Sequence, residues 1–212
     1  MDWQNHLDRI ARDVRPKLGR GQVATYIDAL ARIPNDRFGM AVRTIDGAEF
    51  TVGDGEVPFS IQSISKLFTL TMAMNFIGDR LWKRVGREPS GNPFNSLVQL
   101  EREEGIPRNP LINAGAHVVT DCLAAHCRNP QRDIIRFIRH IAGNQLIDYD
   151  GEVAASERAT GYRNFALANF LKSFGNLEND VDKVLDLYFH QCAISMSCLD
   201  LCRAASFLAN NG

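Results

Sequence analysis

Residues 57–70, V-P-F-S-I-Q-S-I-S-K-L-F-T-L, decide the fold because they combine the start of an apolar helix with an S-x-x-K pair. The pair is Ser63 and Lys66. Ser60 is of a residue type that caps helix N-termini, so the sequence predicts a helix that begins at Ile61. Serine and lysine are common, and S-x-x-K is by itself a weak motif. The surroundings of the pair must therefore decide what it does.

The predicted helix runs to Ile77 and is apolar almost all round, which is typical of a buried helix. A buried helix seldom carries a lysine unless that lysine is paired or used. Positions i and i+3 share a helix face, so Lys66 is expected one turn beyond the Ser63 hydroxyl. Burial disfavours an ammonium group and would make Lys66 a base, while the Ser63 N–H near the helix start is free to face an oxyanion. The alternative is a helix start with a snorkelling lysine.

Length and composition are those of a globular protein: 212 residues, 45% hydrophobic and 23% charged. The formal net charge of −1 predicts neither a nucleic-acid partner nor an acidic membrane surface as partner. No apolar run reaches the length of a transmembrane span. The amino-terminal residues contain no apolar signal-peptide core.

The five cysteines, an odd number, together with the missing signal predict reduced thiols and a cytoplasmic protein. Cys198 and Cys202 share a helical face, but no C-x-x-C pair or nearby histidine completes a zinc site. We therefore expect no metal and no cofactor.

One hairpin stands out from the helical patterns. Residues 38–45 and 48–54 flank an Asp46–Gly47 turn and form the only clear strand pair of the chain. A hairpin alone is marginally stable, so further strands or helix cover are expected. Apolar periodicity and breakers predict helices over residues 2–19, 22–32, 95–103, 111–127, 131–142, 152–158, 162–173, 178–192 and 198–211.

Several polar residues downstream are candidates for a site, each with a structural alternative. Asn113 opens a buried helix and either grips a polar substrate or caps that helix. Glu157 and Asn164 lie on either side of a break at Gly161, and either belong to a site or to a solvated turn.

Two tyrosines and two histidines likewise have either a functional or a structural role. Tyr26 and Tyr188 are either site residues or core residues at helical spacing. His117 and His126 lie on an apolar helix without an obvious carboxylate partner, which favours packed or surface histidines over members of a catalytic triad.

Taken in order, six stretches resemble the serine-dependent glutaminases, which have a β-lactamase-like fold. The likeness extends from about residue 7 to the end of the chain. The stretches are V-A-T-Y-I (23–27), V-P-F-S-I-Q-S-I-S-K (57–66), V-G-R-E-P-S-G-N-P-F-N (85–95), I-P-R-N-P-L-I-N-A-G-A (106–116), S-E-R-A-T-G-Y-R-N-F-A (156–166) and L-Y-F-H-Q-C (187–192).

The resemblance implies hydrolysis of L-glutamine to L-glutamate and ammonia through an acyl-enzyme, with Ser63 as nucleophile and Lys66 as its base. Tyr188 and Tyr26 are implied as further catalytic-site residues. The residues implied in substrate binding are Ser63, Asn113, Glu157, Asn164, Tyr188 and Gln62. A carboxylate suits the substrate ammonium, and amide or phenol groups suit its carboxylate.

The resemblance also implies a mixed α/β (α+β) fold of the β-lactamase/DD-peptidase-like kind and a homo-oligomer, a dimer or tetramer. Relatives of this kind continue beyond the point where this sequence ends. We therefore expect residues 1–212 to be a single catalytic domain that is incomplete at its C-terminus. The remaining sheet strands, a second active-site tyrosine and a second oxyanion N–H are expected to be missing, so that the chain is an inactive fragment.

Two other functions remain open. The first is a helical module that binds glutamine without turnover. The second is a relative of the penicillin-binding proteins and β-lactamases, which share S-x-x-K; it predicts a secretory signal and an S-x-N or Y-x-N motif after the Ser63 helix. No secretory signal is found in the amino-terminal residues.

Overall fold

The hairpin predicted from the sequence is present in the computed structural model, which describes residues 1–211. Strands β1 (Gly39–Arg43) and β2 (Glu49–Gly53) pair antiparallel, with Ala41 opposite Thr51. Gly47 in the turn has a φ of 92°, a conformation that glycine adopts without a steric penalty. The prediction of this hairpin is confirmed.

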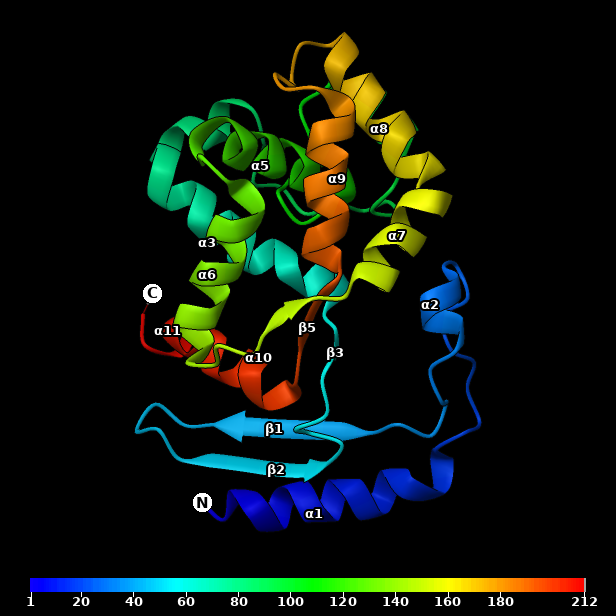
Figure 1. Cartoon of the computed structure of the whole chain (residues 1–212), viewed down its shortest axis with the longest axis vertical. Helices are drawn as coiled ribbons and strands as arrows, with labels where there is room; N and C mark the ends of the chain where they lie inside the picture. Colours follow the sequence, from blue (N-terminus) through cyan, green and yellow to red (C-terminus); the bar gives the residue numbers. More distant parts are fainter. Residues whose placement is uncertain (212) are drawn as a thin grey trace.

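Two helices cover the hairpin (Figure 1): α1 (Trp3–Val14) packs against β2, and α10 (Cys198–Ala204) packs against β1. The helix α1 presents Leu7 and Ala11 to the interior and is capped by Asp2, so the amphipathic pattern of the sequence was interpreted correctly. On α10, the thiols of Cys198 and Cys202 face carbonyl oxygens of β1. The helix cover that a bare hairpin needs is thus provided from both ends of the chain.

A second sheet was not predicted. Its strands are β3 (Phe59–Ser60), β4 (Asp148–Tyr149) and β5 (Ile194–Met196), in the antiparallel order β3-β5-β4. The expectation that the hairpin is the only strand pair is therefore wrong. Strands of two or three residues are too short to show an alternating pattern.

The remaining helices form the larger layer above the hairpin in Figure 1, with α3 (Ser65–Ile77), α5 (Asn113–His126) and α9 (Val181–Cys192) at its centre. Gly115 allows α5 to approach the preceding loop, because a Cβ there would lie 1.9 Å from the Asn109 carbonyl oxygen. The other helices are α2 (Asp28–Ala31), α4 (Leu97–Arg102), α6 (Pro130–Ala142), α7 (Gly151–Thr160), α8 (Tyr162–Ser173) and α11 (Ser206–Ala209), with 3₁₀ turns η1 (Arg15–Lys17), η2 (Gln62–Ile64) and η3 (Gly78–Lys83).

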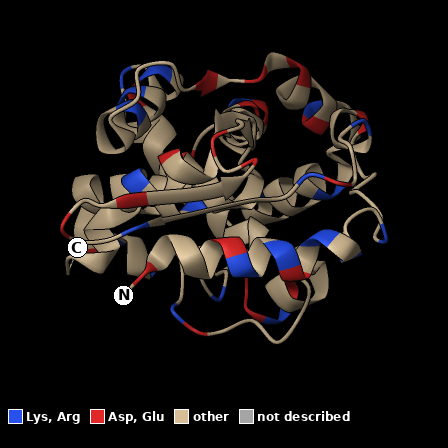
Figure 2. Ribbon diagram, turned by 90° about the horizontal axis from the view of Figure 1, so that it is seen from below, with Lys and Arg blue, Asp and Glu red and all other residues tan. Residues whose placement is uncertain are grey.

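The mixed α/β class is confirmed, with mostly helices and small sheets. Acidic and basic residues are interspersed over the elements in Figure 2, in keeping with the net charge of −1. Among residues 1–211, no helix has both the length and the apolar character required to cross a bilayer.

Several helices differ from the prediction: the helix expected over residues 198–211 is divided into α10 and α11, and the helix expected from residue 178 begins at Val181. Two further differences concern the site. The helix expected over residues 22–32 is reduced to α2, and Tyr26 precedes it in an irregular segment. The helix expected from Ile61 begins at Ser65, because Ser60 belongs to β3 and Gln62 has a φ of 48°. A left-handed residue cannot continue a right-handed helix, so Ser60 is not an N-cap.

A buried ion pair connects α5 to the loops around it. The Asp121 side chain is fully buried and accepts a hydrogen bond of 2.6 Å from Arg84. Its two oxygens also accept the backbone N–H groups of Glu178 and Asn179, at 3.0 and 2.8 Å. The pKa of Asp121 is lowered because these hydrogen bonds outweigh the effect of burial. The carboxylate is therefore fully satisfied.

We predict that Asp121→Ala lowers the free energy of unfolding by about 3 kcal/mol, because the substitution leaves Arg84 and two N–H groups without their partner. Urea unfolding followed by circular dichroism measures the change. Glu152→Ala is the control, since Glu152 pairs with Arg32 on the surface and its loss is expected to cost less than about 1 kcal/mol. Equal effects of the two substitutions would contradict the prediction.

Candidate active site

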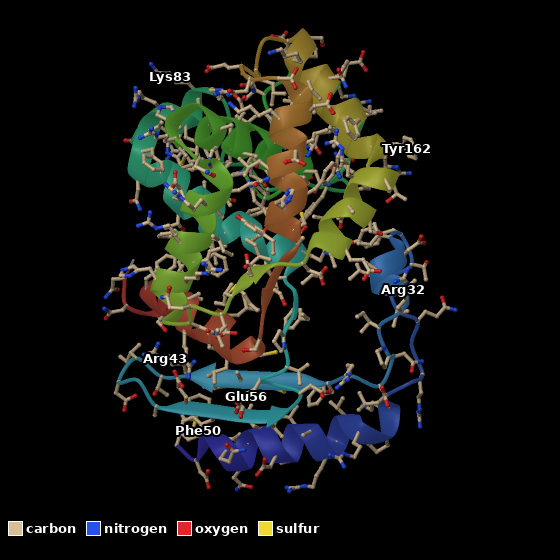
Figure 3. All side chains as sticks on the ribbon, viewed as in Figure 1. Arg32, Arg43, Phe50, Glu56, Lys83 and Tyr162 are labelled. Atoms are coloured by element: carbon tan, nitrogen blue, oxygen red, sulfur yellow. The ribbon has the colours of Figure 1, made fainter. Side chains whose placement is uncertain are left out.

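A pocket of about 550 Å³ lies between the start of α3, the start of α5, the junction of α7 and α8, and α9. Tyr162, at the start of α8, marks the outer side of this junction in Figure 3. Among the residues that line the pocket are seven that the sequence analysis named: Tyr26, Gln62, Ser63, Asn113, Glu157, Asn164 and Tyr188. They come from segments up to 162 positions apart in the chain (26 to 188), and the fold brings them together. A second hollow of about 480 Å³ beside β4 and α10 contains none of them.

Ser63 lies in η2, the 3₁₀ turn between β3 and α3, and its side chain is exposed to the pocket. The turn is fixed by Gln62, whose side chain accepts a hydrogen bond from the Tyr26 hydroxyl (3.1 Å) and donates one to Ser60 Oγ (3.2 Å). A backbone bond of 2.9 Å from Ile61 to β5 anchors the entry to the turn. Among the described residues the Ser63 N–H has no carbonyl partner, which leaves it available to a ligand.

Lys66 lies behind the pocket wall and is 2% exposed. Its Nζ donates to the Leu111 carbonyl (3.1 Å) and to Asn113 Oδ1 (2.8 Å), and the Phe94 ring centroid lies 5.8 Å away. Burial lowers the pKa of the Lys66 ammonium to about 8. Within residues 1–211 both hydrogen bonds of Lys66 Nζ go to residues other than Ser63. The snorkelling alternative is wrong, because the ammonium is buried and hydrogen-bonded.

Asn113 connects Lys66 to the pocket. It is the first residue of α5 and follows Ile112 at the N-cap. Its Nδ2 donates a hydrogen bond of 3.2 Å to Asn164 Oδ1. The side chains Lys66, Asn113 and Asn164 thus form a continuous hydrogen-bonded chain. The alternative of a capping role for Asn113 is wrong, since its side chain bonds to other side chains.

Glu157, on α7, is 7% exposed and lines the pocket. Its carboxylate makes no hydrogen bond or ion pair with any other residue in the described part of the chain. Burial raises its pKa. A buried carboxylate without a partner is costly, and a cationic group in the pocket would relieve that cost. The alternative of a solvated surface turn is therefore wrong for Glu157.

The two tyrosines differ in exposure. Tyr188, on α9, is 3% exposed, and burial raises its pKa well above the usual value. Tyr26 is 59% exposed; burial of part of the ring, followed by the Glu157 charge, raises its pKa to about 12. Both phenols are protonated at neutral pH, and the one O–H of Tyr26 is donated to Gln62 Oε1.

Five further residues with polar side chains line the pocket and were not named as site residues: Asn95, Thr160, Tyr162, Arg163 and Cys192. Arg163 directly precedes Asn164, and Cys192 follows Tyr188 by one helical turn. Their positions next to the named residues could therefore have predicted that they line the pocket. Burial raises the pKa of the Cys192 thiol to about 12, which makes it a poor nucleophile.

Known proteins match this chain over nearly all its length. The family profile described as "Glutaminase" matches residues 21–212. A glutaminase of Methylobacterium radiotolerans is 56% identical over the whole chain, and a thermolabile glutaminase of Rhizobium etli is 55% identical; the chain covers 69% of each.

Solved structures agree with the sequence matches. A probable glutaminase named ybaS superposes with a TM-score of 0.88 at 31% identity, over 98% of this chain and 69% of that one. A probable glutaminase of Bacillus subtilis gives a TM-score of 0.87 at 31% identity, over 99% of this chain and 65% of the other. On this evidence the chain belongs to the glutaminase family, hydrolases that act on the side-chain amide of glutamine.

Proposed function

We propose that the pocket binds L-glutamine with its side-chain amide at Ser63. The observation that carries the proposal is the unpaired carboxylate of Glu157, which shares one pocket with two amide side chains and an exposed serine. The substrate ammonium pairs with Glu157. The substrate carboxylate takes hydrogen bonds from donors on the pocket wall: the Asn113 and Asn164 amides and the phenols Tyr26 and Tyr188. Tyr26 exchanges its hydrogen bond to Gln62 for one to the substrate.

In the proposed reaction, the Ser63 hydroxyl attacks the side-chain amide carbon and its proton passes to neutral Lys66. The C–N bond breaks, the nitrogen takes up that proton, and ammonia leaves a glutamyl ester on Ser63. Water then adds to the ester, and glutamate leaves as the Ser63 oxygen regains a proton. The unpaired Ser63 N–H supports this proposal, because it can donate one hydrogen bond to the oxyanion. The phenols of Tyr26 and Tyr188 line the same pocket and make the surroundings of the reacting amide more polar.

Three parts of the proposal concern the whole protein. We propose that residues 1–212 form part of one catalytic domain. The chain covers 69% of the length of its relatives, and we propose that the remaining part of such a protein supplies further strands and a second oxyanion donor. Without that donor the rate would fall about 10²–10³-fold. We further propose a cytoplasmic homo-oligomer, dimer or tetramer; the five free thiols support a reducing compartment.

A second candidate is a module that binds glutamine without turnover. It is favoured by one observation: Lys66 donates both its hydrogen bonds to α5 and its preceding loop and none to Ser63. Calorimetric binding of glutamine without release of ammonia would select this candidate over the hydrolase.

We predict that Ser63→Ala reduces ammonia release from glutamine by about 10³-fold or more, because the acyl-enzyme can no longer form. A coupled assay for ammonia measures the rate, and calorimetry is expected to show glutamine binding within threefold of the parent. Ser173→Ala, on the exposed side of α8, serves as control and keeps the parental rate. Full activity of the Ser63 variant would refute the assigned nucleophile.

We predict that kcat/KM for glutamine rises with pH through an ionisation near 8, because only the neutral Lys66 amine can accept the serine proton. Lys66→Arg keeps the charge and is expected to remove both the activity and the pH step. Lys172→Arg changes an exposed lysine on α8 and should leave the pH profile as it is. A profile that is flat between pH 7 and 9 would exclude Lys66 as the base.

We predict that Glu157→Gln weakens glutamine binding by about 10- to 150-fold, which corresponds to the loss of one charged hydrogen bond of about 1.5–3 kcal/mol. Calorimetry measures the change. The matched control is Glu152→Gln on the same helix, since Glu152 pairs with Arg32 away from the pocket. Unchanged affinity in the Glu157 variant would show that the ammonium binds elsewhere.

A further inference from the structure

Arg163 is the second residue of α8 and lines the candidate active-site pocket directly beside Asn164. Its side chain is exposed, and within residues 1–211 its guanidinium makes no hydrogen bond or ion pair. The nearest arginine along the chain behaves differently, since Arg158 on α7 pairs with Asp182 at 2.8 Å. Arg163 is therefore a positive charge at the pocket without a partner in the described part of the chain.

The position of Arg163 does not suit the helix that carries it. The first turn of a helix is the positive end of the helix dipole, so a carboxylate is favoured there and a cation is not. The first turn of α8 contains no acidic residue, and Gly161 at its N-cap provides no side-chain acceptor. Local helix energetics therefore give no reason for an arginine at this position, whereas a negatively charged ligand in the pocket would.

The pocket lining contains one acid and one base. Among the described residues that line it, Glu157 and Arg163 are the two that carry a formal charge, and they make no ion pair with each other. Glu157 is 7% exposed whereas Arg163 is open to solvent, so the acid lies deeper than the base. Two opposite charges that line one pocket without pairing suit a ligand that brings both an ammonium and a carboxylate.

We propose that Arg163 is a specificity-determining residue that forms an ion pair with the α-carboxylate of the substrate at the outer end of the pocket. Asn164 assists, because its Oδ1 accepts from Asn113 and its Nδ2 is left to donate to the same carboxylate. The inference rests on the proposed function and deepens it. The amides give the carboxylate hydrogen bonds, and Arg163 adds the charge that distinguishes free glutamine from glutamine whose α-carboxyl group is blocked.

The test compares L-glutamine with its α-amide, two ligands that differ only at the carboxyl group. Binding is measured by calorimetry at about pH 7, where the amine of such an amide is still mostly charged. All proteins carry Ser63→Ala, so that neither ligand is hydrolysed. We expect Arg163→Gln to weaken glutamine binding about fivefold, the upper end for an exposed ion pair, and to leave the affinity for the α-amide unchanged. Glu157→Gln should weaken both ligands, since both carry the ammonium.

Two further variants complete the test. Arg163→Lys keeps the charge and should recover most of the affinity for glutamine. Arg136→Gln is the matched control, because it removes an exposed arginine of α6 that does not line the pocket, and it should leave both affinities unchanged. Parental glutamine affinity in Arg163→Gln, or an equal loss for both ligands, would overturn the inference and leave the proposed function standing. Absence of glutamine binding to the Ser63→Ala parent would overturn both.

Discussion

The hydrogen bonds of the Lys66 ammonium hold the pocket together. A lysine that is 2% exposed loses its hydration, and the two acceptors that replace the water come from Leu111 and Asn113 at the start of α5. The bond to Asn113 continues to Asn164 on α8. One desolvated charge thus ties three helices, α3, α5 and α8, to a common point. The same burial that requires those bonds lowers the pKa of the amine and makes it a base near neutral pH.

The pocket differs from the core in how its polar groups are satisfied. Asp121 is as deeply buried as any site residue, yet an arginine and two backbone N–H groups satisfy it completely. Glu157 is almost as buried and has no partner within residues 1–211. The two carboxylates therefore shift in opposite directions: the pKa of Asp121 is lowered and that of Glu157 is raised. The contrast supports the proposal that Glu157 pairs with a cationic group of the substrate.

Much of this arrangement could be predicted from the sequence, and the rest depends on contacts that no local pattern contains. The hairpin and the amphipathic helices were predictable because their periodicity spans several residues. The sheet β3-β5-β4 was not, since its strands have two or three residues each and β3 pairs with β5 across more than 130 positions. Spacing placed Ser63 and Lys66 on one continuous helix, whereas Ser63 lies in the 3₁₀ turn η2 before α3, and the left-handed Gln62 separates that turn from β3. The gathering of seven candidates in one pocket followed from a whole-chain resemblance and from no single motif.

The conformation of Gln62 has a consequence for the pocket entrance. A non-glycine residue at φ 48° costs about 1–3 kcal/mol relative to a relaxed backbone, and here the Tyr26 and Ser60 side chains hold it in place. If Gln62 relaxed to right-handed helical angles, the chain would leave the turn in another direction, and the pairing of Phe59 and Ser60 with β5 would be lost. The position of Ser63 and the pairing of β3 thus depend on the same strained residue. The hydrogen bonds that join Gln62 to Tyr26 and Ser60 therefore stabilise the turn that carries Ser63 and the edge of the small sheet together.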